Sequence, residues 1–202
     1  MFRKLLSMLV VVLAPLAAFA QYNETGWPVN SIGTPAPSFT KITSNQTWLA
    51  GHVYHLQGVI AVDSGVTITI QPGTIIKGDP GQAANVSTLL FGPCSKCIAQ
   101  GSAALPIIFT TWLDNVGDTG DIPDVASSRG LWGGVIMCGR AFTCAAGGTS
   151  IMEGIPDSGR ITRYGGGLTP VCNDNSGVLS YVSIRYAGSI FTANVEVNCL
   201  SL

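Results

Sequence analysis

The sequence contains few charged residues. Asp, Glu, Lys and Arg together make up 10% of its 202 residues, whereas about a quarter is usual in soluble domains. The formal net charge is −1, and basic residues do not cluster anywhere along the chain. A protein with so little positive charge is not expected to bind nucleic acid, because such binding depends on neutralising phosphates. Its solubility has to come from Ser, Thr, Asn, Gln and Gly.

The sequence also lacks helical periodicity and common catalytic motifs. After the first twenty residues, no stretch combines apolar residues at 3.6-residue spacing with capping residues. The GxSxG, HExxH, P-loop and dinucleotide-binding patterns are absent. The glycine run 165–167 is not followed by a predicted helix, so it is not expected to hold a phosphate. An all-β protein is therefore expected, without one of these well-marked enzyme sites.

The long hydrophobic run of the chain lies at its N-terminus. Arg3 and Lys4 precede the apolar stretch 5–19, and Ala18-Phe19-Ala20 has the small residues of a cleavage site. The stretch is shorter than the roughly 20 residues that span a bilayer, and Pro15 interrupts it. We expect residues 1–20 to be a signal peptide, and the mature protein to be secreted or on the outer cell surface without a transmembrane segment. A retained membrane anchor is the alternative.

Strand and turn signals fill the rest of the chain. The 25 Gly and 11 Pro residues separate short runs rich in Val, Ile and Thr. In the run 66–70, Val66, Ile68 and Ile70 alternate with two threonines, which is the period of a half-buried strand. Strands are predicted at 59–62, 66–70, 74–77, 88–91, 97–100, 107–111, 132–137, 150–153, 178–185 and 195–202.

The connections between these runs favour a parallel β-helix. They are corners containing Gly, Pro or Asn instead of two-residue hairpin turns. Repeated corners coil the chain so that successive turns pair in parallel. We predict inward ladders of residues such as Ile68, Leu90 and Ile108, a leader or irregular N-terminal cap at 21–40, and the β-helix at 41–202. A β-sandwich is the alternative fold. Because the last strand pattern stops without a cap, the chain is predicted to be an N-terminal fragment of a longer β-helix.

Several segments carry a family resemblance. The segments 65–78, 100–110, 129–136 and 175–188 occur in the order found in certain exported proteins common in Bacteroidota. The chain resembles these proteins, which have a right-handed, pectate-lyase-like parallel β-helix. The resemblance implies that fold over roughly 42–202 and implies little about function, since most such proteins have no demonstrated activity. The cysteines of this chain depart from the family pattern.

The six cysteines all follow the predicted signal peptide. An even number in an exported chain indicates disulfides. Cys94 and Cys97 flank a turn, and Cys138 and Cys144 flank a short loop, so each pair is predicted to close its own loop. Cys172 and Cys199 are separated by about one coil and are predicted to join adjacent coils. A redox or zinc role for the Cys94-x-x-Cys97 pattern lacks the helix or the second ligand pair that it needs.

Two sets of candidate site residues remain. An acidic loop carries Asp114, Asp118, Asp121 and Asp124, whose oxygens could bind calcium, although their spacing differs from an EF-hand and a solvated loop is the alternative. Aromatic and basic side chains that could contact a glycan are Trp132, Tyr164, Tyr181, Arg185 and Tyr186. Internal packing and Arg–aromatic stacking explain these residues equally well.

We therefore rank three functions. The first is a non-catalytic secreted or cell-surface scaffold of adhesin type, with surface glycans or other surface proteins as partners. The second is a carbohydrate-binding β-helix. The third is a polysaccharide lyase or hydrolase, for which the predicted strands offer few carboxylates: Glu153 and Glu196 fall in different coils. No catalytic residue is assigned, and no cofactor is expected apart from the calcium considered above.

Overall fold

The computed structural model describes residues 22–118, 121–122, 128–192 and 195–202, so the predicted signal peptide lies outside the described residues. Nearly all regular structure in this part of the chain is β-strand. Its helices are three single 3-10 turns, η1 (Ala83–Asn85), η2 (Ala146–Gly148) and η3 (Gly159–Thr162). None of the helices in the described residues is long and apolar enough to cross a membrane.

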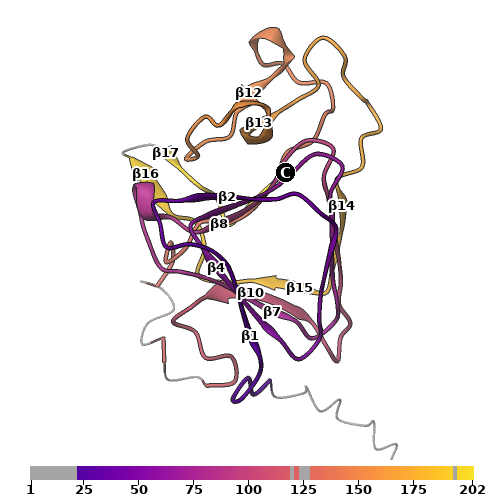
Figure 1. Ribbon diagram of the computed structural model, residues 1–202. Coiled ribbons are helices and arrows are strands. Elements are labelled where there is room, and N and C mark those ends of the chain that lie inside the picture. The colour runs from indigo at the N-terminus through magenta and orange to yellow at the C-terminus, as the bar shows by residue number, and fades with distance from the viewer. Residues whose placement is uncertain (1–21, 119–120, 123–127, 193–194) are drawn as a thin grey trace, which may run out of the picture.

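Three parallel sheets form the body of the protein (Figure 1). We name them sheets A, B and C. Sheet A contains β1 (Val29–Gly33), β4 (Val53–Gln57), β7 (Ile75–Gly78), β10 (Ile107–Thr111) and β15 (Val182–Ile184). Sheet B contains β2 (Phe39–Ile42), β5 (Val59–Val62), β8 (Thr88–Phe91), β11 (Gly134–Met137) and β18 (Leu200–Ser201). Sheet C contains β3 (Gln46–Trp48), β6 (Thr67–Ile70), β9 (Lys96–Gln100) and β14 (Gly177–Ser180).

The chain visits the three sheets in the same order on each coil. Every strand of these three sheets pairs in parallel with the strand one coil before or after it, as β4 does with β1 and β7. The β-strands thus form a right-handed parallel β-helix with three walls, which Figure 1 shows nearly end-on. The predicted fold is confirmed. The alternative β-sandwich is excluded because none of the pairs within sheets A, B and C is antiparallel.

The corner between sheets A and B is a single residue in the second coil. Gly58 joins β4 to β5 with φ of +75°. A Cβ at this position would lie 2.0 Å from Ser38 Oγ, so only glycine fits here without displacing the first coil. A one-residue corner turns the chain from one wall to the next without reversing it, which a hairpin would do.

The first coil begins earlier than expected. The segment 21–40, expected as an irregular leader or cap, contains β1 and the first residues of β2. Both strands pair in parallel with the second coil, Val29 with Val53 and Phe39 with Val59. The prolines at 28, 35 and 37 fall outside these strands, so they interrupt neither of them.

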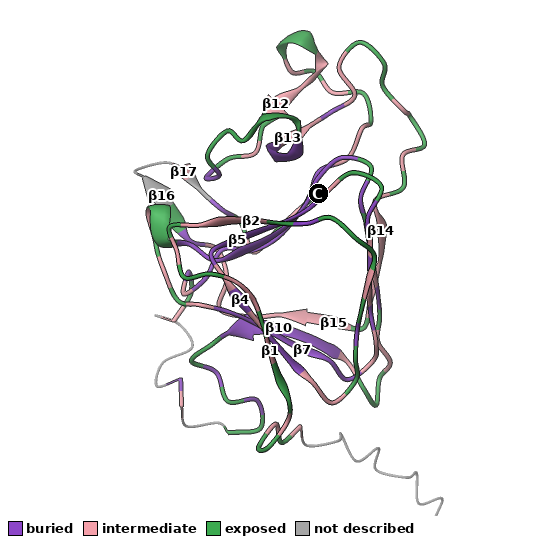
Figure 2. Cartoon of the chain, viewed as in Figure 1, coloured by how far each residue is buried: buried purple, intermediate pink, exposed green. Residues whose placement is uncertain are grey.

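Side chains pointing into the coil form the main core. Columns run from coil to coil, for example Ile60, Leu89 and Val135 in sheet B, each at most 1% exposed. A second inward column contains Tyr54, Ile76 and Phe109 in sheet A. Trp48 and Trp132 are also fully buried in this core. Figure 2 shows the buried positions concentrated on sheets A and B, whereas the wall formed by sheet C is mixed.

The predicted ladder of Ile68, Leu90 and Ile108 is wrong. The three residues lie in sheets C, B and A respectively, and only Ile68 belongs to the main core. Leu90 and Ile108 alternate with inward residues and belong to two separate outer clusters. Both outer clusters are buried because other parts of the chain cover them, so burial alone does not mark the inside of this coil.

Two insertions cover the outer clusters. Residues 138–176 leave the coil between β11 and β14 and contain β12 (Ser150–Ile151) and β13 (Arg163–Tyr164), an antiparallel pair. This insertion lies over the outer face of sheet B (Figure 1), where Ile155 and Ile161 pack with Leu90. A second excursion between β10 and β11 contributes Val116 to the outer cluster on sheet A. The last coil carries β16 (Ile190–Thr192) and β17 (Val195–Glu196), also antiparallel.

Candidate functional site

The outer face of sheet A carries a row of polar residues from successive coils. Parallel register places His55 beside Lys77 and Lys77 beside Thr110. Arg185 follows in the next coil, since its N–H donates to the carbonyl of Phe109 at 2.9 Å. A second row on the same outer face is apolar and contains Val53, Ile75 and Ile108. Each of these residues lies two positions before its polar neighbour in the same strand. Sheet A therefore brings ionisable groups from distant parts of the sequence into one line.

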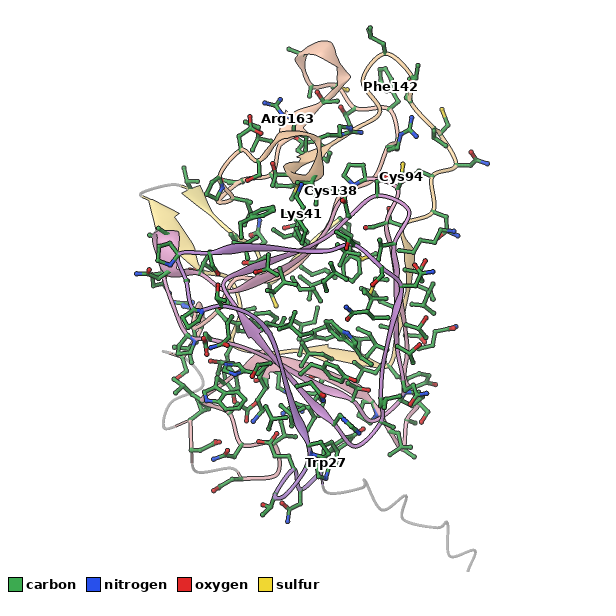
Figure 3. The ribbon with its side chains drawn as sticks, in the orientation of Figure 1. Trp27, Lys41, Cys94, Cys138, Phe142 and Arg163 are labelled. Carbon is green, nitrogen blue, oxygen red and sulfur yellow. The ribbon has the colours of Figure 1, made fainter. Side chains whose placement is uncertain are left out.

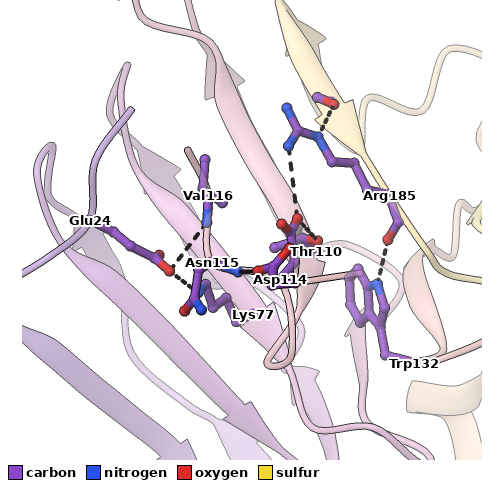
Figure 4. A network of polar contacts seen from close by, with 10 residues as sticks. Glu24, Lys77, Thr110, Asp114, Asn115, Val116, Trp132 and Arg185 are labelled. Atoms are coloured by element: carbon purple, nitrogen blue, oxygen red, sulfur yellow. Dashed lines mark hydrogen bonds and ion pairs between the residues drawn. The ribbon is translucent and has the colours of Figure 1, made fainter. Parts of the chain in front are cut away.

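The N-terminal segment closes over one part of this row. Glu24 Oε1 accepts a hydrogen bond from Lys77 Nζ and another, at 3.3 Å, from the N–H of Val116 (Figure 4). The side chains of Lys77 and Glu24 are 4% and 12% exposed. Tyr22 anchors the segment by donating its hydroxyl to the carbonyl of Pro106 at 2.5 Å, and burial raises the pKa of Tyr22. The pair Glu24–Lys77 is thus a largely buried ion pair.

A second charge pair occupies the far end of the row. Thr110 Oγ1 donates to Asp114 Oδ2 at 2.5 Å, and Arg185 Nη1 lies 3.8 Å from the same oxygen. Asp114 is 4% exposed, whereas the Arg185 side chain is 39% exposed. The carbonyl of Arg185 also accepts the indole N–H of Trp132 at 2.8 Å (Figure 4). Asp114 therefore anchors the start of its loop to the coil.

Trp112 contacts both His55 and Lys77 and is partly exposed to solvent. Its ring stacks on His55, with ring centroids 3.8 Å apart and an interplanar angle of 18°. Lys77 Nζ lies 5.6 Å from the centroid of the Trp112 ring, within the range of a cation–π contact. His55 Nε2 contacts Asp79 Oδ1 at 2.5 Å. Trp112 itself is 38% exposed, so it remains accessible to a ligand.

A hollow of about 1060 Å³ opens between the N-terminal segment and the excursion after β10. Three aromatic side chains line it: Tyr22, Trp27 and Trp112. Its polar wall consists of Asn23, Glu24, Thr25, Lys77, Asn115 and Asp118. The Tyr22 and Trp27 rings are tilted by 59°, with centroids 6.2 Å apart. Flat apolar rings beside amides and hydroxyls are the lining expected of a site for a polar ring-shaped ligand.

The acidic loop is only partly described, because Asp124 lies outside the described residues. Asp114 bonds to Thr110, Asp121 Oδ2 accepts the N–H of Asn115, and Asp118 lines the hollow. Within the described ranges, no group of three or more His, Cys, Asp or Glu residues is arranged to hold a metal ion. The calcium site stays a prediction of the sequence.

The five predicted glycan-contacting residues do not form one surface. Trp132 is fully buried, so the expectation that it contacts a glycan is wrong: its ring packs against Gly78, where only a residue without a side chain fits. Tyr164 lies in β13 and packs on the outer cluster of sheet B. Tyr181, which is 62% exposed, precedes β15, while Arg185 and Tyr186 follow it and line a cavity of about 400 Å³.

All six cysteines are free thiols, so the three predicted disulfides are not formed in this structure. Cys97 points into the main core from β9, whereas Cys94 is exposed on the corner before it. Cys138 is buried and Cys144 is exposed. Cys172 belongs to the insertion over sheet B, and Cys199 lies beside Ile184 in the last coil. In each predicted pair the two residues occupy different environments. Neither a short separation, as for the first two pairs, nor a separation of about one coil, as for Cys172 and Cys199, makes side chains face one another.

The buried thiols should make the protein less stable at high pH. Burial raises the pKa of Cys97 to about 12; it raises that of Cys138 to about 12 as well, although Arg160 acts in the opposite direction. In the unfolded chain both thiols ionise near their ordinary pKa of about 8.5. The unfolded state therefore loses protons first, and stability is expected to fall as the pH rises from about 9 to 12. Urea unfolding at pH 7, 9 and 10.5 measures this fall. The fall should be clearly smaller in the double variant Cys97→Ala and Cys138→Ala, where Cys199 and Tyr22, whose pKa values burial also raises, still contribute. An equal fall in that variant would contradict the assignment.

The residues that the sequence did not reveal are Glu24, His55, Lys77, Asp79 and Trp112. The sequence does contain a signal for His55 and Lys77. Each is the third residue of a short, mostly apolar run, 53–56 and 75–78 respectively. Aligning the two runs as successive coils would have placed His55 beside Lys77. Glu24 has no such signal, because it reaches the face from outside the coil. Trp112 directly follows β10, two positions after Thr110, and its N–H donates to the carbonyl of Gly78 at 2.8 Å.

The protein is a parallel β-helix protein. Its coil has three walls, and one wall carries a row of polar groups and a hollow lined by aromatic side chains. Within this class, a family model described as the pectate-lyase-like beta helix domain matches residues 40–202, and the chain belongs to that family. Comparison with curated proteins and with solved structures finds no match.

Proposed function

We propose that the protein is an exported, non-catalytic β-helix that acts as an adhesin-like scaffold at the cell surface or outside the cell. One observation carries the proposal: the ionisable groups gathered on sheet A are bonded to one another. Lys77 pairs with Glu24, His55 with Asp79, and Asp114 with Thr110 and Arg185. These contacts join the N-terminal segment and the loop after β10 to the coil. The role we infer for these ionisable side chains is therefore to stabilise sheet A.

The covering of the walls supports the same proposal. Glycoside hydrolysis needs two carboxylates that face each other across a gap open to the sugar. On sheet A, the Glu24 and Asp114 side chains are 12% and 5% exposed. On sheet B, the insertion 138–176 covers the outer face. The outer face of sheet C carries Thr47, Thr69, Ile98 and Val178 in register, a row without ionisable groups.

We expect no release of reducing ends or unsaturated uronates when the protein is incubated with pectic, alginate, xylan and glucan substrates. The reason is that the carboxylates on sheet A are already engaged by partners within the chain. A pectate lyase added to the same substrates serves as the positive control. Activity that is lost in Asp114→Asn or Asp79→Asn and kept in Asp157→Asn, an exposed carboxylate on the insertion, would overturn the non-catalytic proposal.

The signal peptide predicted for residues 1–20 supports the proposed location. Expression of the full-length gene in a Gram-negative host and N-terminal sequencing of the exported product test it, with Gln21 as the expected first residue. A product found only in the cytoplasm, or one that keeps Met1, would contradict the location.

Carbohydrate binding is a second candidate function, and the hollow on sheet A favours it. Three aromatic rings line a space of about 1060 Å³ beside three neutral polar residues, Asn23, Thr25 and Asn115. Aromatic faces pack against the C–H faces of sugar rings, and the amides and hydroxyl can exchange hydrogen bonds with sugar hydroxyls. An adhesin-like scaffold needs such a surface, so the two candidate functions are compatible.

A further inference from the structure

We infer that the hollow on sheet A takes a glycan without acidic groups and rejects polyuronates. This inference rests on the carbohydrate-binding function proposed above and names the ligand class for that site. It starts from the charges that line the hollow. Among the described lining residues, Glu24 and Asp118 carry carboxylates, and Lys77 is the one cation. The charges of Glu24 and Lys77 offset each other, so the described lining offers no unpaired cation to a ligand carboxylate.

Lys77 is not available to bind an acidic sugar. Its side chain is 4% exposed, its ammonium group donates to Glu24, and it lies 5.6 Å from the centroid of Trp112. A ligand carboxylate could reach this charge only by displacing Glu24, which would leave a second carboxylate nearby. An acidic polymer brings one negative charge with each sugar, and each carboxylate would lose hydration in the hollow without gaining a cation there.

The remaining lining groups suit an uncharged sugar. Trp112 is 38% exposed and its ring is held by stacking on His55, so it offers a fixed apolar face. Asn23 and Thr25 are also held in place, because Asn23 Oδ1 accepts the N–H of Thr25 at 3.0 Å. A preorganised aromatic face with neutral polar neighbours binds hydroxylated rings without requiring a countercharge. The hollow thus offers stacking and hydrogen bonding to a neutral sugar, and no free cation to an acidic one.

Affinity electrophoresis and calorimetry with purified protein test the inference. The probes are four neutral polysaccharides (glucan, mannan, galactan and xylan) and two acidic ones (polygalacturonate and alginate). The variants are Trp112→Ala and Trp27→Ala, which remove rings from the hollow, and Phe142→Ala as the matched control. Phe142 is 71% exposed on the insertion over sheet B, far from Trp27 in Figure 3. Thermal melting checks that each variant is folded, and either hollow variant suffices if the other does not fold.

We expect at least one neutral polysaccharide to bind, with an affinity about tenfold lower in Trp112→Ala and unchanged in Phe142→Ala. The affinity should change by less than about twofold between 0.05 and 0.5 M NaCl, since no charge pair forms with the ligand. Tightest binding to polyuronate, weakened by Trp112→Ala and by salt, would overturn this inference and leave carbohydrate binding standing. If no glycan binds, or if neither hollow variant weakens binding, the carbohydrate-binding function itself fails.

Discussion

Replacing Ile68 by Ala is expected to lower the free energy of unfolding by about 2–5 kcal/mol, whereas Ile98→Ala should lower it by about 1 kcal/mol or less. Both residues belong to sheet C, in the adjacent strands β6 and β9. Ile68 points into the coil and is fully buried, and its removal leaves a cavity between Trp48, Cys97 and their neighbours in the main core. Ile98 is half-buried on the outer face.

Urea denaturation of the two variants and the wild type measures this difference. The comparison is matched, because the same side chain is shortened by the same atoms on the two faces of one sheet. Equal losses would mean that the inward and outward faces of sheet C have been assigned wrongly. Since coils are stabilised mainly by their neighbours, the slope of each transition should also be compared, to detect partial unfolding of one end.

Removing one partner of the Glu24–Lys77 pair is expected to cost about 3–5 kcal/mol. In Lys77→Met the carboxylate of Glu24 would remain 12% exposed without its cation, and Oε2 of that carboxylate already lacks a hydrogen-bond partner. In Glu24→Gln the ammonium group of Lys77 would lose its anionic partner in the same way. The double variant should be much closer to wild type than the sum of the two single losses, because it leaves no unpaired charge.

The double-mutant cycle is measured by urea unfolding at pH 7. The exposed pair Arg163–Asp157 on the insertion provides the control, and Arg163→Met should leave stability nearly unchanged. Losses that simply add in the cycle would show that Glu24 and Lys77 do not interact in solution. In that case the N-terminal segment would lose its charged contact with sheet A and would depend on the hydrogen bond from Tyr22 to Pro106.

The strands were largely predictable because their local chemistry agrees with their position in the coil. The runs 59–62, 88–91 and 107–111 coincide with β5, β8 and β10. Period-two alternation gives two faces for each strand, but it does not say which face points inward when both are apolar. Leu89 and Leu90 show the difficulty: both are fully buried, one in the main core and one under the insertion. The insertion 138–176 carried one strand signal, at 150–153, where β12 lies, but nothing in it indicated that the segment leaves the coil.

The site was less predictable than the fold for a related reason. Its residues come from several coils and from two segments outside the coil, so the site exists only once the register between coils is known. Lys77 is charged and yet 3% exposed, which the sequence could not indicate without Glu24 53 positions earlier in the chain. Trp132 shows the opposite error, since an aromatic residue proposed for ligand contact is part of the core. The cysteines likewise had suitable spacing but unsuitable directions.

The indole N–H signals of the four tryptophans test most directly whether the hollow on sheet A binds a neutral glycan. Trp27 and Trp112 line the hollow, whereas Trp48 and Trp132 are buried in the core, bonded through their indole N–H groups to Gln46 and to the carbonyl of Arg185. Tryptophan-to-phenylalanine variants at 27 and 112 assign the signals in a ¹⁵N–¹H spectrum. During titration with neutral oligosaccharides, the signals of Trp27 and Trp112 should shift while those of Trp48 and Trp132 stay in place. Binding that shifts neither of the hollow signals would contradict the account.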